Sequence, residues 1–309
     1  MVDLIIAGGH SKALAIKVSR ITRIPYFLPE LKKFPDGEKY VRIDTELEDK
    51  TIAVIQSMAL KPDEYLIEYY LMVKTLKDLG AKKVIGIIPY FAYARQDERF
   101  KPGEAISFAY IAKLIEAAGT DEIYTIDTHM HRVLDMEQIF TKPVKNVTAV
   151  PLLTEYFIKN YNFEEPVVIG PDAEAIQWAK VAAEILKAEY DVLEKQRLSG
   201  SEVEIKTREV NVKDRDVFIV DDIISTGGTI IEATKVLKKN GAKRIVASCT
   251  HPILVMDALP RMFANGIYDV FGTDTVPSPI SYVTVAPVSY THLRAHETRH
   301  DLVCRLLLE

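Results

Sequence analysis

The segment with the strongest chemical character is Val220-Asp221-Asp222-Ile223-Ile224-Ser225-Thr226-Gly227-Gly228-Thr229. An apolar run typical of a strand reaches the two acids, and a small-residue loop then opens a stretch of helical periodicity. Adjacent glycines let the backbone approach a ligand closely, and the unpaired N–H groups of a helix start attract an anion. Thr226 and Thr229 add hydroxyl donors, and the two carboxylates suit sugar hydroxyls or, through water, a metal ion. This order predicts a phosphate site, although a plain helix N-cap with solvated acids is the alternative.

A second segment, Pro89-Tyr90-Phe91-Ala92-Tyr93-Ala94-Arg95-Gln96-Asp97, follows an apolar run over Val84–Ile88. Ligands of α/β proteins bind beyond the carboxyl ends of strands, where this segment is expected. Arg95 offers a forked cation for nucleotide phosphates, and Gln96 can hydrogen-bond a nucleotide. Arg99 and Lys101 follow in a loop with Pro102 and Gly103, which is typical of a mobile lid. A surface loop of solvated charges is the alternative.

Short apolar runs and segments of helical periodicity alternate along the whole chain. Strands are expected at Leu4–Ala7, Thr51–Gln56, Val84–Ile88, Glu122–Ile126, Val167–Ile169, Val217–Val220 and Ile245–Ser248. Helices are expected at Asp63–Leu79, Ser107–Ala118, Asp172–Lys187 and Gly228–Lys239. Such alternation predicts an α/β protein with mainly parallel sheets flanked by helices.

An internal repeat indicates two related domains. Residues 74–85 (KTLKDLGAKKVI) and 235–246 (KVLKKNGAKRIV) share lysine, leucine, lysine, glycine, alanine and lysine at the same offsets. Each copy has the pattern of a helix end, a glycine cap and a buried strand. A length of 309 residues also favours two domains at about 150 residues each. We expect domains at residues 1–146 and 147–288, with the final helix returning to the first.

Composition limits the classes of function. Hydrophobic residues make up 48% and charged residues 27%, typical of a globular protein, and the net charge of −5 argues against a general nucleic-acid-binding surface. The two cysteines, Cys249 and Cys304, form no CxxC pair, which fits a reducing compartment. No apolar run approaches the ~20 residues of a membrane span, and the N-terminus lacks a signal-peptide pattern. The sequence therefore predicts a cytoplasmic protein that contacts neither membrane nor nucleic acid.

The Asp221–Thr229 segment resembles the phosphoribosyl-pyrophosphate motif of type I phosphoribosyltransferase folds. Many members carry an acid where this chain has Ser225. Serine keeps a hydrogen-bond donor, so phosphate binding is expected to survive. The resemblance implies two tandem phosphoribosyltransferase-like domains. It also implies that the ribose 5-phosphate site comprises Asp221, Asp222, Ser225, Thr226, Gly227, Gly228 and Thr229.

Other segments resemble the archaeal-like ribose-phosphate pyrophosphokinase family. Phe34-Pro35-Asp36-Gly37-Glu38 is similar to an ATP-contacting loop that a neighbouring subunit usually receives, although Pro-Asp-Gly is also an ordinary turn. Ile126-Asp127-Thr128-His129-Met130-His131 resembles the metal segment of the family, with His129 at the metal position. The resemblance implies ATP-binding roles for Phe34, Asp36, Gly37, Glu38, Arg95, Gln96, Asp97 and Arg99. It assigns Asp172 to a second metal-associated position.

Leu193-Glu194-Lys195-Gln196-Arg197 resembles the catalytic Lys-x-Arg of the family. Lys195 suits the charge that develops on transferring phosphates, and Arg197 suits bridging oxygens or the pentose phosphate. On composition alone, Lys195 and Arg197 are typical of a solvent-exposed surface. The evidence for a catalytic role is that all these segments occur in the same order along the chain as in the family. The resemblance covers residues 1–287. It implies Mg²⁺-dependent transfer of the ATP pyrophosphoryl group to ribose 5-phosphate by a homo-oligomer with shared active sites.

Two alternatives stay open from the sequence. A phosphoribosyltransferase with a nucleobase acceptor keeps the Asp221–Thr229 loop but has no need of Arg95-Gln96 or Phe34–Glu38. A non-catalytic regulatory homologue is expected to have lost charged residues that this chain retains, such as Lys195, Arg197 and Arg95.

The character of the sequence changes from about Ser289. His292, His296 and His300 recur every four residues, which on a helix forms one face that suits a transition metal. The segment resembles a translated sequencing-adapter read-through. Our hypothesis is that residues 289–309 are a foreign tail without function, which replaces the native last helix.

Overall fold

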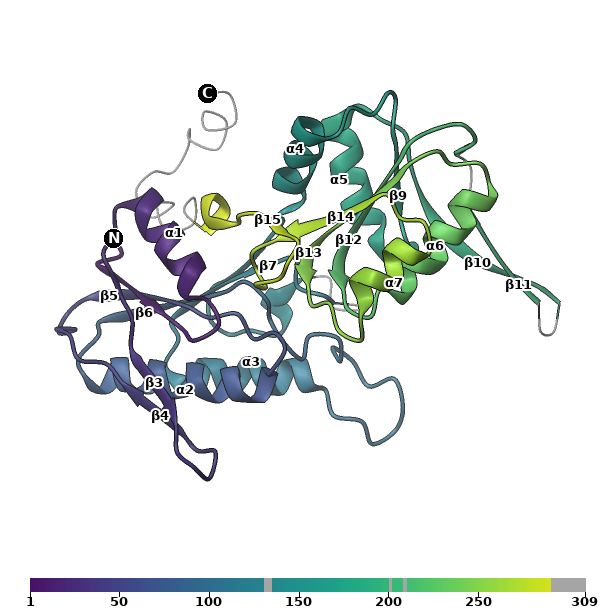
Figure 1. The fold of residues 1–309 in the computed structure, drawn as a ribbon. Helices are drawn as coiled ribbons and strands as arrows, with labels where there is room; N and C mark the ends of the chain where they lie inside the picture. The colour runs from purple at the N-terminus through teal and green to yellow at the C-terminus, as the bar shows by residue number, and fades with distance from the viewer. Residues whose placement is uncertain (131–134, 200–201, 208–209, 290–309) are drawn as a thin grey trace. The chain divides into compact units, whose positions relative to one another are not determined.

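A computed structural model describes residues 1–130, 135–199, 202–207 and 210–289, with only the backbone for residues 194–199 and 202–207 (Figure 1). The chain divides into two compact units. Unit 1 comprises Met1–Val147 with the residues from Thr284 onward, and unit 2 comprises Thr148–Val283. The expectations for His131 and for the tail at residues 290–309 lie outside the described residues.

Unit 1 is built on a parallel six-stranded sheet in the order β2-β1-β5-β6-β7-β8, beside a separate antiparallel pair, β3 and β4. The strands are β1 (Leu4–Ala7), β2 (Tyr26–Phe27), β3 (Glu30–Lys33), β4 (Lys39–Arg42), β5 (Thr51–Ile55), β6 (Lys83–Ile88), β7 (Glu122–Ile126) and β8 (Val144–Val147). The helices are α1 (Lys12–Thr22), α2 (Pro62–Asp78), α3 (Ser107–Ala118) and the 3-10 turn η1 (Met136–Gln138).

The core of unit 1 lies between the sheet and two helices. Alternate strand residues such as Ile6, Val54 and Val84 pack with Met72 of α2 and Phe108 of α3 in one buried cluster. Figure 1 shows α2 and α3 on one side of the sheet and α1 on the other. A parallel sheet needs cover on both faces, which explains why its central strands, such as β1 and β5, are almost entirely apolar.

Unit 2 has a seven-stranded sheet in the order β11-β10-β9-β12-β13-β14-β15, parallel except for the antiparallel edge strand β11. The strands are β9 (Val167–Gly170), β10 (Tyr190–Ser199), β11 (Glu202–Thr207), β12 (Val217–Ile224), β13 (Ile245–Pro252), β14 (Asp269–Thr273) and β15 (Ser281–Val283). The helices are α4 (Val150–Asn160), α5 (Ile176–Leu186), α6 (Gly228–Lys239), α7 (Ala258–Ala264) and the 3-10 turn η2 (Ala173–Ala175).

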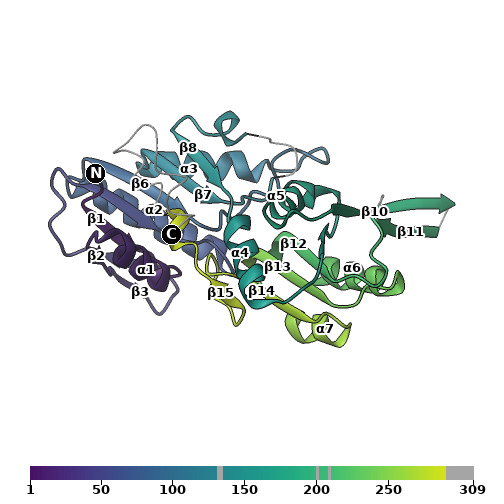
Figure 2. The ribbon, with the colours of Figure 1, turned by 90° about the horizontal axis from the view of Figure 1, so that it is seen from above.

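Two clusters of buried side chains cover the two faces of the unit 2 sheet. Ile219 packs with Leu237 of α6 and Met262 of α7 on one face. Phe218 packs with Phe157 of α4 and with α5 on the other. The pair β10–β11 projects from the body of unit 2 (Figures 1 and 2).

The internal repeat forms the same local structure in both units. Gly80 and Gly241 have φ values of +88° and +87°, a left-handed conformation that favours glycine. The next residue donates its amide hydrogen to the carbonyl five residues earlier in each copy, from Ala81 to Leu76 and from Ala242 to Leu237, both at 3.0 Å. This is the helix-ending motif that the repeat predicts. Strands β1, β5, β6, β7 and β8 also lie in the same order as β9, β12, β13, β14 and β15.

The predicted α/β class with two parallel sheets flanked by helices is confirmed, and the expected strands and helices occur near their predicted positions. One expected start was wrong. The helix expected from Asp172 begins at Ile176, because Asp172 caps the short turn η2 that precedes it. No helix in the described part of the chain combines the length and apolarity needed to traverse a bilayer.

Candidate functional site

The acid pair of unit 2 lies within strand β12 rather than after it. The strand continues through Asp221 and Asp222 to Ile224, so the expected end at Val220 was wrong. The extension has a simple cause, because β13 also runs on to Pro252 and pairs with these residues, with Asp221 opposite Cys249. Both acids are thereby buried, at 8% and 2% exposure.

The loop after β12 has the form of an anion site. Gly227 adopts φ +73° and forms the N-cap of α6, and a Cβ there would lie 3.1 Å from the Met262 side chain. Glycine is therefore required on both conformational and steric grounds. Thr226 and Thr229 are exposed, and the first amides of α6 have no carbonyl behind them in the helix. These groups can surround a phosphate.

The loop is also fixed from behind. Val255 donates its amide hydrogen to the carbonyl of Ser225 at 3.0 Å. Arg261 of α7 donates to the carbonyl of Thr226 at 3.3 Å. The carbonyl groups of the loop are thus held by the protein. At the helix start, the Gly228 amide donates to Thr226 Oγ1 over a long 3.4 Å, and the threonine hydroxyls and neighbouring amides can serve as donors for a ligand.

Burial raises the pKa of Asp221 well above its ordinary value, and the nearby charges of Asp222 and Asp172 raise it further. None of the described side chains that act on Asp221 is positively charged. The pKa of the Cys249 thiol is also raised, by burial and by these acids. This edge of unit 2 therefore concentrates negative charge and favours a ligand that brings cations or hydroxyl donors.

Asp172 lies after β9, at the same carboxyl edge as Asp221. Its Oδ1 accepts the amide hydrogens of Glu174 at 3.0 Å and Ala175 at 3.2 Å. It therefore caps η2 in addition to the metal role that the sequence suggests.

Lys195 and Arg197 lie on β10, whose pairing with β9 ends at Val192 opposite Gly170. The strand then continues beyond the carboxyl end of β9, paired only with β11. The two residues thus lie within a strand. Their side chains are outside the described part of the structure.

The Pro89–Asp97 segment follows the carboxyl end of β6, as predicted. Arg95 and Arg99 are exposed, whereas Asp97 is buried. Gln96 donates its side-chain amide to the carbonyl of Glu98 and to Glu104 Oε2, both at 3.1 Å. Of Arg95, Gln96, Asp97 and Arg99, only the two arginines are thus exposed to solvent.

His129 follows β7, the strand next to β6, and is half-buried. The carboxyl ends of β6 and β7 meet at one edge of the unit 1 sheet, so His129 and the Pro89–Asp97 segment follow the same edge. No group of three or more histidine, cysteine, aspartate or glutamate side chains in the described ranges is arranged to hold a metal ion.

Phe34, Asp36, Gly37 and Glu38 form the loop between β3 and β4. Gly37 adopts φ +100°, and the Phe34 ring is 50% exposed. The turn predicted from Pro-Asp-Gly is therefore present, with an aromatic side chain directed to solvent.

Two buried polar side chains near these edges were not predicted from the sequence. In unit 2, the buried His251 contacts Thr275 at 2.9 Å, in the part of β13 beyond the expected strand end. In unit 1, the buried Glu68 of α2 contacts Lys39 and Gln56. A signal for the second group was present, since Glu64 and Glu68 share one helix face and Lys33 and Lys39 flank the Phe34–Glu38 loop.

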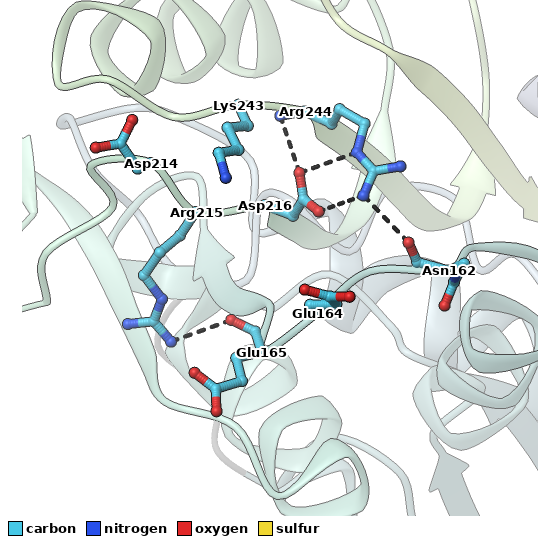
Figure 3. Close-up of a pocket in the computed structure, with 8 residues that line it drawn as sticks. All are labelled: Asn162, Glu164, Glu165, Asp214, Arg215, Asp216, Lys243 and Arg244. Carbon is cyan, nitrogen blue, oxygen red and sulfur yellow. Dashed lines mark hydrogen bonds and ion pairs between the residues drawn. The ribbon is translucent and has the colours of Figure 1, made fainter.

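A pocket of about 890 Å³ in unit 2 lies at the amino ends of β9, β12 and β13, opposite the edge that carries Asp221 (Figure 3). Arg244 is paired with Asp216 and lies 4.1 Å above the Phe163 ring. Arg215 is paired with Glu189 and donates to the carbonyl of Glu165. The protein itself neutralises both arginines, so this pocket is a poor candidate for the phosphate site.

Comparison with known families assigns both units. Residues 4–119 match the N-terminal domain of ribose phosphate pyrophosphokinase, and residues 147–257 match the phosphoribosyl transferase domain. With its two parallel sheets and the strand–acid–glycine–helix segment, the chain is thus a protein of two tandem phosphoribosyltransferase-type domains.

Similar proteins identify the family more closely. The chain is 42% identical over 285 residues to the ribose-phosphate pyrophosphokinase of Methanothermobacter thermautotrophicus, covering 92% of this chain and 98% of that protein. It is 44% identical over 258 residues to that of Methanopyrus kandleri, covering 84% and 87%. The crystal structure of phosphoribosylpyrophosphate synthetase from Mycobacterium smegmatis superposes with a TM-score of 0.86 at 29% identity, covering 95% and 98%. The chain belongs to the ribose-phosphate pyrophosphokinase family.

Proposed function

We propose that this protein converts ATP and ribose 5-phosphate into AMP and 5-phosphoribosyl 1-pyrophosphate, an activated sugar for nucleotide biosynthesis. The observation that carries the proposal is the Asp221–Thr229 segment, which combines two buried acids, a left-handed Gly227 and the start of α6. Membership of the family and the names of the relatives support the same activity.

The reaction forms one bond to phosphorus and breaks one. The anomeric oxygen of ribose 5-phosphate attacks the β-phosphorus of ATP, and its proton passes to solvent. The bond from that phosphorus to the bridging α–β oxygen breaks, and AMP leaves. Positioning and electrostatic stabilisation dominate such phosphoryl chemistry.

In unit 2, we assign the sugar phosphate to the loop from Ser225 to Thr229. The amide groups at the start of α6 and the exposed threonine hydroxyls bind the 5-phosphate oxygens. Asp221 and Asp222 orient the ribose hydroxyls. Lys195 and Arg197 stabilise the charge that develops on the transferring phosphates.

In unit 1, we assign ATP binding to two loops. Arg95 and Arg99 provide exposed cations for the triphosphate, with Gln96 and Asp97 in the same segment. The Phe34–Glu38 loop contacts the nucleotide of a neighbouring subunit, with Phe34 and the polar groups of Asp36, Gly37 and Glu38. This assignment requires a homo-oligomer, so we expect dilution to monomers to abolish the activity. We further propose that the protein acts in the cytoplasm.

Mg²⁺ is the metal ion that fits the acidic residues at the carboxyl edge of unit 2. Asp172, Asp221 and Asp222 present oxygen ligands of like charge close enough to affect one another. Mg²⁺ commonly binds through one or two carboxylates together with substrate phosphates, so an incomplete protein site is expected. We assign metal-associated roles separately in the two units, to Asp172 in unit 2 and, through water, to His129 in unit 1. The bound ion would neutralise charge on the triphosphate.

The test is an assay of the purified protein with ATP, ribose 5-phosphate and Mg²⁺. We expect AMP and 5-phosphoribosyl 1-pyrophosphate in equal amounts, with no nucleobase required. A nucleobase phosphoribosyltransferase would instead consume 5-phosphoribosyl 1-pyrophosphate and release pyrophosphate without forming AMP from ATP. A protein that does neither would support the regulatory alternative.

A further inference from the structure

The Phe34–Glu38 loop lies at the end of a hairpin that is not part of the main sheet of unit 1. Its strands β3 and β4 pair with each other, and Lys33 opposite Lys39 is the last pair before the loop. An isolated two-stranded hairpin is only marginally stable. The direction in which it holds its loop must therefore depend on contacts with the rest of the unit.

The loop itself has a defined internal form. Phe34 donates its amide hydrogen to the carbonyl of Glu38 at 2.8 Å, and Gly37 donates to that of Phe34 at 2.9 Å. The Phe34 ring meets the Tyr40 ring edge to face at 5.9 Å. A loop closed in this way moves as one body with the two residues that flank it, Lys33 and Lys39.

Both flanking lysines are tied to helix α2. Lys33 Nζ lies 2.5 Å from Glu64 Oε2, and Lys39 Nζ lies 2.8 Å from Glu64 Oε1. Lys39 Nζ also lies 2.7 Å from Glu68 Oε2. Glu64 and Glu68 are four residues apart, so they lie on one face of the helix and receive both strands of the hairpin.

The contacts continue from Glu68 into the carboxyl edge of the unit 1 sheet. Glu68 Oε1 accepts the amide hydrogen of Gly9 at 2.8 Å and the side-chain amide of Gln56 at 3.2 Å. Gln56 directly follows β5, and Gly9 lies two residues beyond the end of β1. Glu68 is 2% exposed and Lys39 11%, so water competes little for these bonds. An unbroken set of charge-assisted bonds thus links the base of the loop to the sheet.

We infer that Glu64 and Glu68 are positioning residues for nucleotide binding, because through Lys33 and Lys39 they fix the direction of the Phe34–Glu38 loop. This inference rests on the proposed function, in which that loop contacts ATP. It assigns to α2 a task in substrate binding although neither glutamate touches the substrate. In this proposal the Lys39–Glu68 pair, which is largely shielded from water, serves to fix geometry, and removal of one partner leaves the other without this compensating charge.

The hairpin offers a matched control. Lys32 forms an ion pair with Glu30 on the same strand, and the Lys32 side chain is 65% exposed. This pair resembles the others in chemistry but makes no contact with α2 among the interactions described. Substitution of Lys32 therefore removes a charge from the hairpin but keeps the anchor, which we define as the ion pairs of Lys33 and Lys39 with Glu64 and Glu68.

The experiment measures kcat and the KM of each substrate for the full-length Lys39→Met, Glu64→Gln and Lys32→Met variants. We expect the first two to raise the KM for ATP about tenfold, the scale of one charge-assisted hydrogen bond, with the KM for ribose 5-phosphate unchanged. Lys39→Arg, which keeps the charge, should restore most of the loss. Lys32→Met should behave as the unsubstituted protein.

A second readout follows the loop directly. Hydrogen exchange in the peptide that spans residues 30–42 should accelerate in Lys39→Met and Glu64→Gln but not in Lys32→Met. The half-buried Glu64 keeps the test valid should Lys39→Met fail to fold.

Two results overturn the inference in different ways. If Lys39→Met and Glu64→Gln have the same KM for ATP as the Lys32→Met control, the ion pairs with α2 have only a structural role. The proposed function is not affected by that result. No AMP formation by the unsubstituted protein would remove the proposed function, and the positioning role with it.

Discussion

In each unit an acidic side chain lies at the carboxyl edge of the sheet, but the surroundings of the two acids differ. In unit 1, the helix after β5 directs Glu68 to the carboxyl edge of the sheet, where Lys39, Gly9 and Gln56 all donate to it. In unit 2, the corresponding strand β12 carries Asp221 at this edge, and burial, Asp222 and Asp172 all disfavour its charged form. The protein thus supplies hydrogen-bond donors to the Glu68 carboxylate, whereas the Asp221 carboxyl group lies near other acids.

This difference explains how a duplicated domain acquires two tasks. An acid whose hydrogen bonds are complete fixes neighbouring segments, and in unit 1 it anchors the hairpin that carries the Phe34–Glu38 loop. An acid that is buried near other acids favours a ligand that supplies hydroxyl donors or a cation. Functional sites often retain this kind of unfavourable electrostatics.

The largest expected effect concerns Lys195 on β10, to which we assign a catalytic role. We expect Lys195→Ala to lower kcat by roughly 10²- to 10³-fold, because it removes a cation that stabilises the transferring phosphates. Binding of ribose 5-phosphate, measured by calorimetry, should be nearly unchanged. Near-normal turnover would show that the unit 2 edge does not supply this charge.

The next effect concerns the phosphate loop. Gly227→Ala places a Cβ at φ +73° and 3.1 Å from Met262 Cγ, so the loop must distort. We expect a loss of about 1–2 kcal/mol in unfolding free energy from the left-handed conformation alone. The KM for ribose 5-phosphate should rise by about tenfold or more, since each 1.4 kcal/mol corresponds to a factor of ten.

Gly228→Ala is the matched control for stability in that experiment. The Cβ that it adds lies in ordinary contact, 3.5 Å from Thr226 Oγ1, and Gly228 has no positive φ. Its unfolding free energy should therefore stay close to that of the unsubstituted protein. Equal destabilisation by both substitutions would contradict a special role for the Gly227 conformation.

A smaller effect follows from the raised pKa of Asp221. The folded protein holds this proton to higher pH than the unfolded chain, whose carboxyl has an ordinary pKa of 3.8. Stability is therefore lost as the pH rises from 3.8 through the raised pKa. Asp221→Asn lacks this loss, so its advantage in Tm should grow from pH 4 to pH 8. The Tm of both proteins is measured by thermal unfolding across this pH range. A Tm difference that stays constant would contradict an electrostatic origin of the effect.

Much of this fold could be predicted from sequence, because its strongest signals are local. Gly80 and Gly241 mark two identical helix ends, and each signal lies within a few residues of the structure it specifies. The Asp221–Thr229 segment is local in the same sense, since strand, acids, glycines and helix are consecutive. The lengths of β12 and β13 were both underestimated, because each extension depends on pairing with the other strand.

The anchor of the hairpin could not be predicted in this way. Lys39 and Glu68 are 29 residues apart, and each is a common surface residue type. Nothing in the sequence around either residue indicates that both are buried. Their role depends on the direction in which a hairpin packs against a helix, which is a property of the folded unit.

The most direct test of the comparison between the units measures the thermal stability of two variants at pH 7.5, each of which replaces one acid by its amide. Glu68→Gln removes a satisfied charge, so we expect Tm to fall by several degrees, in line with about 1–3 kcal/mol for a hydrogen bond to a charged group. Asp221→Asn removes a carboxyl group whose ionisation is disfavoured in the folded protein, so Tm should rise although the enzyme loses activity. Shifts of the same sign in both variants would contradict the account.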